Sequence, residues 1–187
     1  MNIVLFGPPG AGKGTQAKYL IKKLNSFQIS TGELLREEIY KNSDIGKIIT
    51  NDMKNGKFVS DEIVNSLIEK FISDPKKKNK LIFDGYPRSL SQAKNLDVLL
   101  EASNQKVDLI LYLKVDKETV VKRLEKRKII ENRSDDETIT ILKRFDTYMN
   151  TTEPVLNYYS GNPNFQEIDG SLEIDEITRK IDAFINV

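Results

Sequence analysis

The 187-residue sequence contains no cysteine and no histidine. These absences exclude disulfide bonds, thiolate and imidazole nucleophiles, histidine general bases, and metal sites built from cysteine and histidine. Any chemistry that the chain performs must therefore use lysine, arginine, carboxylates, main-chain amides and a hard cation.

Long hydrophobic runs are also missing. The longest apolar run, Leu109–Leu113, is far too short to span a bilayer. The first residues, Met1–Gly7, have no basic region before their apolar stretch and lead directly into a glycine-rich loop, so we expect no secretory signal and a cytoplasmic protein. The net charge of +1 gives no reason to expect a nucleic acid or an anionic membrane as a partner.

Arginine is scarce, and its distribution is more informative than the net charge. Six of the seven arginines lie in or near segments that we expect to face phosphate groups, namely Arg36, Arg88, Arg123, Arg127, Arg133 and Arg144. Arginine offers a planar fork that binds phosphate through two hydrogen bonds. The alternative is that the few arginines are scattered by chance among surface lysines.

Short apolar runs alternate with helical periodicity along the chain. Five runs predict buried parallel strands: Met1–Phe6, Phe27–Ile29, Lys80–Phe83, Val107–Leu113 and Phe165–Ile168. Helical spacing of apolar residues first occurs over Lys13–Leu24, and later helices have capping boxes at Ser30–Glu33, Ser89–Gln92 and Ser134–Glu137. The alternation predicts a doubly wound α/β fold, and the chain length is typical of one domain.

A glycine-rich loop, Gly7–Thr15, lies between the first strand and the first helix. Its glycines allow successive main-chain N–H groups to converge on phosphate oxygens at the positive end of the helix dipole, and Lys13 adds a charge. The usual pattern has a hydroxyl directly after the lysine to reach Mg²⁺. Here Gly14 occupies that position and the hydroxyl belongs to Thr15, so direct ligation of the metal by the threonine is in doubt.

This loop resembles the phosphate loop of the nucleoside monophosphate kinases, adenylate kinases above all. Three more blocks follow in the order and spacing of that family: Ser30–Arg36, Phe83–Arg88, and Asn132–Asp136 with Arg144 after it. The resemblance runs from Met1 to about Tyr159, with a nucleotide loop at Asp169–Leu172. It implies a P-loop NTPase-type fold, a five-stranded parallel sheet flanked by helices, in a single domain spanning residues 1–187.

The resemblance also implies which residues bind the nucleotides. On the ATP side these are Gly10, Ala11, Gly12, Lys13, Gly14, Thr15, Arg123, Arg127 and Leu172. On the AMP side they are Thr31, Arg36, Lys57, Phe58, Val59, Gly85, Tyr86, Pro87, Arg88, Gln92, Arg133 and Arg144. The catalytic residues are Lys13, Arg88, Arg123, Arg133 and Arg144.

Two of these residues have a competing structural interpretation. Thr31 can be an AMP contact or a simple helix cap. Gln92 can contact the base of AMP, or it can be the third-position partner of Ser89 in a capping box.

Arg36 lies about one turn into a helix whose N-terminal amides also attract an anion, which suits a monophosphate.

Asp84 ends one of the predicted strands, so its carboxylate should emerge at the edge of the sheet where ligands of open α/β folds bind. A hard oxygen ligand there suits Mg²⁺, which we expect to be bound through water as MgATP. We expect no zinc, because the sequence offers no cysteine or histidine ligands.

Arg123 and Arg127 are four residues apart and lie on one face of a predicted helix. The resemblance implies that the positions of Arg123, Arg127, Arg133 and Arg144 together form the hinge of a lid, the lid itself and a phosphate clamp. The alternative is a basic helix that pairs with Glu125 and Glu131. Only five residues separate Arg127 from Arg133, so we expect a short lid at about 126–132, together with a mobile AMP-binding insert at 30–59.

The resemblance implies reversible phosphoryl transfer from MgATP to AMP, giving two ADP. The nucleophile is an anionic phosphate oxygen, so the reaction needs no general base, and we expect a monomer. The nearest alternative is a UMP/CMP kinase of the same fold. A nucleotide-dependent switch protein is a third hypothesis, but its D-x-x-G and N-K-x-D segments do not occur in the chain. The sequence does not decide the preferred donor triphosphate.

Overall fold

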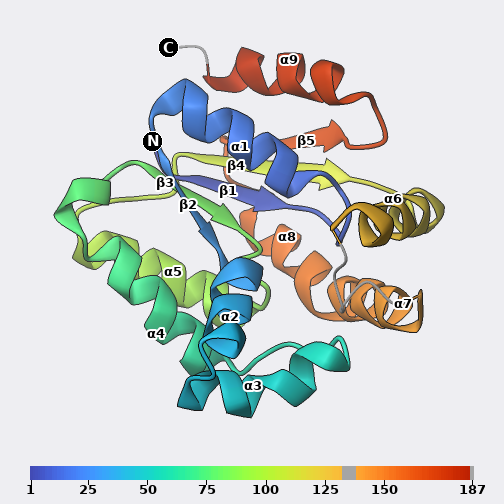
Figure 1. Cartoon of the computed structure of the whole chain (residues 1–187). Helices are drawn as coiled ribbons and strands as arrows, with labels where there is room; N and C mark the ends of the chain where they lie inside the picture. Colours follow the sequence, from blue (N-terminus) through green and yellow to red (C-terminus); the bar gives the residue numbers. More distant parts are fainter. Residues whose placement is uncertain (132–137, 186–187) are drawn as a thin grey trace.

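The computed structural model describes residues 1–131 and 138–185 of the chain (Figure 1). In this part of the chain, a parallel sheet has the strand order β2-β3-β1-β4-β5. Its strands are β1 (Ile3–Phe6), β2 (Phe27–Ser30), β3 (Leu81–Asp84), β4 (Leu109–Lys114) and β5 (Phe165–Asp169). The structure confirms the five-stranded parallel sheet, including the short strand that begins at Phe27.

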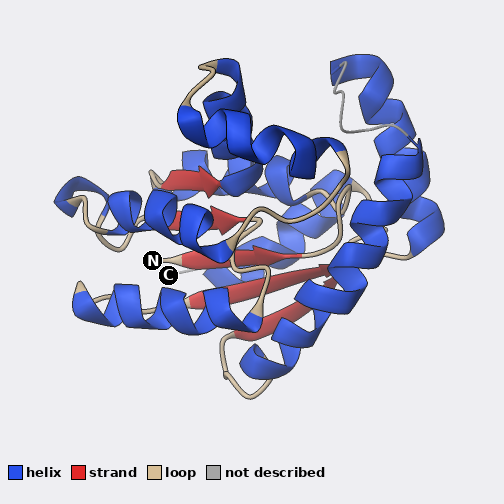
Figure 2. Cartoon of the chain, turned by 90° about the horizontal axis from the view of Figure 1, so that it is seen from below, coloured by secondary structure: helices blue, strands red, loops and turns tan. Residues whose placement is uncertain are grey.

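Helices cover both faces of this sheet (Figure 2). The α-helices of the first half are α1 (Lys13–Leu24), α2 (Thr31–Tyr40), α3 (Asp44–Lys54), α4 (Asp61–Ile72) and α5 (Leu90–Ala102), with a short 3₁₀ helix at Pro75–Lys77. The second half contains α6 (Lys117–Glu131), α7 (Thr138–Thr147), α8 (Glu153–Tyr159) and α9 (Ile174–Ile185), with a π-helical turn at Tyr148–Thr152. No described helix is long and apolar enough to cross a membrane.

Side chains of β1 alternate between two separate apolar cores. Val4 and Phe6 pack in the core under α4, α5 and α8, whereas Ile3 and Leu5 pack in the core under α1, α6, α7 and α9. Figure 1 shows α1 and α9 on one side of the sheet and α4 and α5 on the other. Because both faces are buried, the strands read as continuous apolar runs, which is why the sequence reveals them.

The strand order reverses direction at β1, which lies between β3 and β4. In open α/β sheets, ligands bind outside the carboxyl ends of the strands at such a point. The loop that follows β1, residues 7–12, is the glycine-rich loop of the sequence analysis. The fold therefore places this loop at the expected ligand-binding edge.

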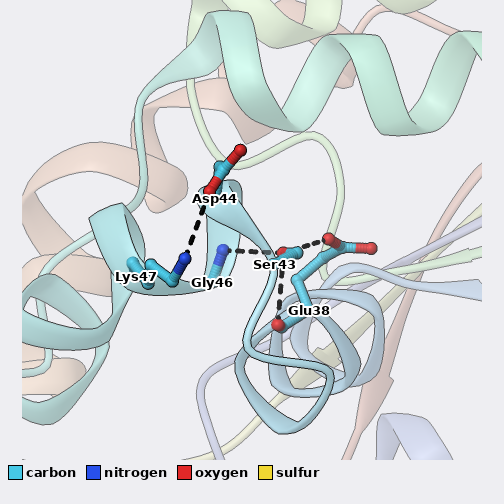
Figure 3. A network of polar contacts seen from close by, with 5 residues as sticks. All are labelled: Glu38, Ser43, Asp44, Gly46 and Lys47. Carbon is cyan, nitrogen blue, oxygen red and sulfur yellow. Dashed lines mark hydrogen bonds and ion pairs between the residues drawn. The ribbon is translucent and has the colours of Figure 1, made fainter.

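Helices α2 and α3 meet at a tight corner (Figure 3). The Ser43 hydroxyl accepts a hydrogen bond from the main-chain N–H of Gly46 at 2.9 Å and lies 2.5 Å from a carboxylate oxygen of Glu38. A Cβ atom at Gly46 would lie only 2.2 Å from the Glu38 carbonyl oxygen, so a larger residue could not keep this crossing. The two helices are thus fastened to each other by backbone contact and by one serine.

Two of the three predicted capping boxes lie in the described part of the chain. The Ser30 side chain caps α2 by accepting from the Glu33 N–H, and the Ser89 side chain caps α5 by accepting from the Gln92 N–H. The third, Ser134–Glu137, lies outside the described residues.

Asn2 is fully buried just before β1 and connects three segments at the amino ends of the strands. Its amide nitrogen donates to the Gln105 side chain at 3.2 Å and to the Lys106 carbonyl at 3.0 Å. Its amide oxygen accepts from the Leu81 N–H at 3.1 Å. One side chain therefore satisfies polar groups next to β1, β3 and β4.

Replacing Asn2 by alanine should lower the free energy of unfolding by about 1–3 kcal/mol, because buried polar partners then lose their hydrogen bonds. Urea denaturation of both proteins measures the difference. The matched control is Asn157→Ala in α8, an exposed asparagine whose loss should change stability by no more than about 0.5 kcal/mol. Equal effects of the two substitutions would contradict the bridging role of Asn2.

Candidate active site

The glycine-rich loop ends in a helix N-terminus that is shaped to receive an anion. Gly10 has φ +80° and Gly12 has φ +94°, values that side chains strongly disfavour. Gly12 is the N-cap of α1 and has no side chain to occupy the first-turn amides. Those amides and the helix dipole are therefore directed at whatever binds above the loop.

Lys13 folds back over the loop. Its ammonium group donates to the carbonyl oxygens of Gly7 at 2.7 Å and Pro8 at 3.0 Å. Burial lowers the pKa of Lys13 to about 8, and the nearby charges of Arg88, Arg144 and Arg127 act in the same direction. The Asp84 carboxylate opposes this shift in pKa. Lys13 thus lies in a region of concentrated positive charge.

A cavity opens next to this lysine, between the loop, α2, the end of α3, the segment after β3, and α7. Its lining includes Lys13 and three arginines, Arg36, Arg88 and Arg144. These residues are far apart in the sequence and come from four different segments. The wall also contains five of the residues predicted for the AMP side: Lys57, Phe58, Val59, Gly85 and Pro87. The structure therefore brings together most of the predicted phosphate-binding residues.

Arg88 is held in place by the segment that follows β3. Its Nε donates to the Gly85 carbonyl at 2.7 Å, and its guanidinium carbon lies 5.0 Å from the centre of the Phe58 ring. Gly85 has φ +79°, and a Cβ atom there would lie 2.9 Å from a terminal nitrogen of Arg88. Glycine at this position lets the guanidinium lie directly against the main chain.

Thr31, Tyr86 and Gln92 lie behind the cavity wall, where all three side chains are buried. The Thr31 hydroxyl donates to the Gly85 carbonyl at 2.7 Å. The helix cap of α2 is Ser30, so the interpretation of Thr31 as a simple cap is wrong. The Tyr86 hydroxyl lies 2.8 Å from the Asn65 side chain and 3.2 Å from the main-chain oxygen of Gln92.

The capping box at Ser89 is only half formed. Ser89 does accept from the main-chain N–H of Gln92 at 3.1 Å. The Gln92 side chain, however, accepts from the N–H of Arg88 at 2.7 Å, one residue before the cap. The Gln92 amide thus supports the backbone of a cavity residue.

Asp84 ends β3 at the same edge of the sheet. Its Oδ2 accepts from the Gln28 side chain at 2.9 Å and lies 3.7 Å from the place that a Cβ on Gly14 would take. The carboxylate is therefore beside the first turn of α1. One carboxylate suits Mg²⁺, which commonly keeps most of its water and takes its other ligands from substrate phosphates. Within the described residues, no group of three or more acidic side chains could hold a metal ion.

Arg123 lies on the other side of the loop, against the segment that follows β5. Its guanidinium donates to the carbonyl oxygens of Gly170 at 2.7 Å and Ser171 at 3.3 Å. Leu172, in the same segment, packs against the core under α1. The positive charge of Arg127 contributes slightly to the lowered pKa of Lys13. Arg133 lies outside the described residues, as does part of the predicted lid.

Comparison with known proteins decides which family has this arrangement. The model of the family described as adenylate kinase matches residues 5–163. The chain belongs to the adenylate kinase family. It is therefore a nucleoside monophosphate kinase, an enzyme class that transfers phosphoryl groups.

Curated adenylate kinases resemble this chain over its whole length. The adenylate kinase of Pelagibacter ubique is 45% identical, with all of both chains covered. That of Phenylobacterium zucineum is 41% identical, over 98% of this chain and 96% of the relative. That of Thermosipho africanus is 35% identical, over 97% of each.

The alignments with adenylate kinases also differ in length. The alignment with the Pelagibacter ubique protein has 213 positions, whereas this chain has 187 residues. The alignment with the Phenylobacterium zucineum protein has only 183 positions. The Pelagibacter ubique protein therefore has residues without a counterpart in this chain. The alignment with the Phenylobacterium zucineum protein needs no such insertion.

Sequence reasoning missed several residues that line the adenylate kinase cavity. These are Leu5, Phe6, Gly7, Pro9, Gly32, Leu35, Met53, Gly56, Tyr148 and Thr152. A signal exists for some of them. Arg144, Tyr148 and Thr152 are spaced by four residues, and Leu35 follows Thr31 by four, which places each set on one helix face. Met53 and Gly56 depend on the α2–α3 corner, which periodicity does not reveal.

The lowered pKa of Lys13 predicts a pH dependence of ATP binding. Above about pH 8 the free protein has a neutral Lys13, whereas bound phosphates favour the protonated form. Binding must then take up a proton, so affinity for MgATP should fall between pH 7.5 and 9.5, by up to about tenfold per pH unit. Titration calorimetry in buffers of different ionisation enthalpy measures both the affinity and the proton uptake.

The control for this titration is Lys13→Arg, because arginine stays charged throughout this pH range. Its affinity for MgATP can be weaker at every pH, but it should not fall as pH rises. A wild-type affinity that is constant from pH 7.5 to 9.5 would contradict the lowered pKa.

Proposed function

We propose that the protein transfers the terminal phosphoryl group of MgATP reversibly to AMP, giving two ADP. The observation that carries this proposal is the convergence of Lys13, Arg36, Arg88 and Arg144 on one cavity beside the phosphate loop. Phosphoryl transfer spreads negative charge over the equatorial oxygens, and preorganised cations stabilise that charge. The attacking AMP oxygen is already anionic, so a chain without histidine lacks nothing that the reaction needs.

The proposed ATP site is built on the phosphate loop. The amides of Gly10–Thr15 and the Lys13 ammonium group bind the β- and γ-phosphates, close to the N-terminus of α1. Arg123 and Arg127 approach from α6, and Leu172 lies next to the segment that Arg123 contacts. Mg²⁺ would be held by the phosphates and, through water, by Asp84, where it would neutralise developing charge.

The proposed AMP site lies between α2, the end of α3 and the segment after β3. Arg36 and Arg88 bind the monophosphate, and Lys57, Phe58, Val59, Gly85 and Pro87 form the wall. Thr31, Tyr86 and Gln92 support that wall from behind, and Gln92 also contacts the base. Arg144, together with Arg133, completes the clamp on the transferred phosphoryl group.

We also propose that two segments move around this site. One is the AMP-binding insert, residues 30–59, which contains the fastened pair α2 and α3. The other is a short lid at about 126–132. Only five residues separate Arg127 from Arg133, which supports a short lid. The proposed protein acts as a monomer on the nucleotides of the cytoplasm.

A panel of nucleoside monophosphates tested with MgATP is the experiment for this proposal. AMP should be phosphorylated at least about 10- to 100-fold better in kcat/KM than UMP, CMP or GMP, since one well-placed base contact contributes roughly that factor. The activity should require Mg²⁺ and no transition metal. Faster turnover of UMP or CMP would establish the alternative, a UMP/CMP kinase of the same fold.

A further inference from the structure

Asp61 lies outside the cavity wall but is directly linked to it. As the first residue of α4, it contributes both carboxylate oxygens to the segment after β3. Its Oδ1 accepts from the Gln92 side-chain nitrogen at 2.7 Å, and its Oδ2 accepts from the Ser89 hydroxyl at 3.0 Å. The carboxylate thus joins a helix that has no role in the proposed chemistry to a residue proposed to contact the base.

The Gln92 amide has only one chemically permitted orientation in these contacts. Its oxygen faces the Arg88 N–H, which can only donate, and its nitrogen faces the Asp61 carboxylate, which can only accept. Turning the amide by 180° would place two donors together and two acceptors together. The turned amide would therefore lose both of these hydrogen bonds.

Each end of this amide still has one hydrogen-bonding position left. An amide oxygen accepts twice and an amide nitrogen donates twice, and the contacts with Arg88 and Asp61 use one of each. The remaining pair is an acceptor beside a donor. Adenine presents the complementary pair, its N6 amino group beside a ring nitrogen. Hypoxanthine and guanine have a carbonyl oxygen at that amino position and a hydrogen on N1, so they need the reversed amide.

We propose that Asp61 is a positioning residue for base selectivity, because its carboxylate fixes the Gln92 amide in the orientation that pairs with adenine and not with 6-oxopurines. This inference rests on the proposed function, in which Gln92 contacts the base of AMP. The Arg88 N–H contributes to the same orientation, but it is a main-chain group that substitution cannot remove. Asp61 is therefore the partner through which the orientation can be tested.

The test compares AMP with IMP, the nucleotide in which a carbonyl replaces the N6 amino group. In Asp61→Asn, the new side chain has nearly the same shape but can present either a donor or an acceptor to Gln92. The ratio of kcat/KM for AMP to that for IMP should fall about tenfold, mainly through a lower KM for IMP. The kcat with AMP should change little, because the phosphate-binding residues are untouched.

The matched control is Ser89→Ala, which removes the other partner of Asp61 and the cap of α5. It should lower the melting temperature, as the loss of a helix cap does, and leave the AMP-to-IMP ratio unchanged. If Asp61→Asn does not fold, Asp61→Ser takes its place, because its hydroxyl also donates or accepts.

Two results would overturn the inference. One is a folded Asp61 variant that keeps the wild-type ratio. The other is a Ser89→Ala protein whose ratio falls as far as that of Asp61→Asn, since Asp61 would then act only through the helix cap. A wild-type protein that does not phosphorylate AMP would overturn the proposed function as well, so the two failures are distinguishable.

Discussion

The structure depends on holding several positive charges close together around one cavity. Lys13 donates to the carbonyl oxygens of Gly7 and Pro8, and Arg88 donates to that of Gly85. These carbonyl oxygens hold the two cations in position through hydrogen bonds to the main chain. This arrangement disfavours the charged form of Lys13. Burial is the main cause of its lowered pKa, and the neighbouring arginines lower the pKa further.

The need to hold these cations close together also explains the backbone geometry at the carboxyl ends of β1 and β3. Gly12 and Gly85 both adopt positive φ angles, the first to open the helix N-terminus and the second to let the Arg88 guanidinium lie against the main chain. Thr152 also helps to fix this segment, because its hydroxyl donates to the Arg88 carbonyl at 3.0 Å. Main-chain groups at the carboxyl ends of the strands thus position the cavity residues, and side chains supply the charge.

Much of this could be predicted from sequence because the relevant signals are local. The phosphate loop is one continuous segment, and strands such as β1 are buried on both faces, so apolar runs identify them. The resemblance to adenylate kinases predicted most of the cationic wall. The contact of Gln92 with Asp61 was not predictable, because it depends on how α4 packs beside α5. The same holds for Arg123, whose partners Gly170 and Ser171 lie more than forty residues away in the chain.

The central claim is that the cations around the cavity act together on phosphate oxygens, and the most direct measurement is the steady-state kinetics of Arg144→Lys. The substitution keeps the charge but removes the planar fork, so we predict a loss of about 10²–10³ in kcat/KM with little change in melting temperature. Arg179→Lys, on the exposed side of α9, is the control and should keep full activity. Near-full activity of Arg144→Lys would contradict the account.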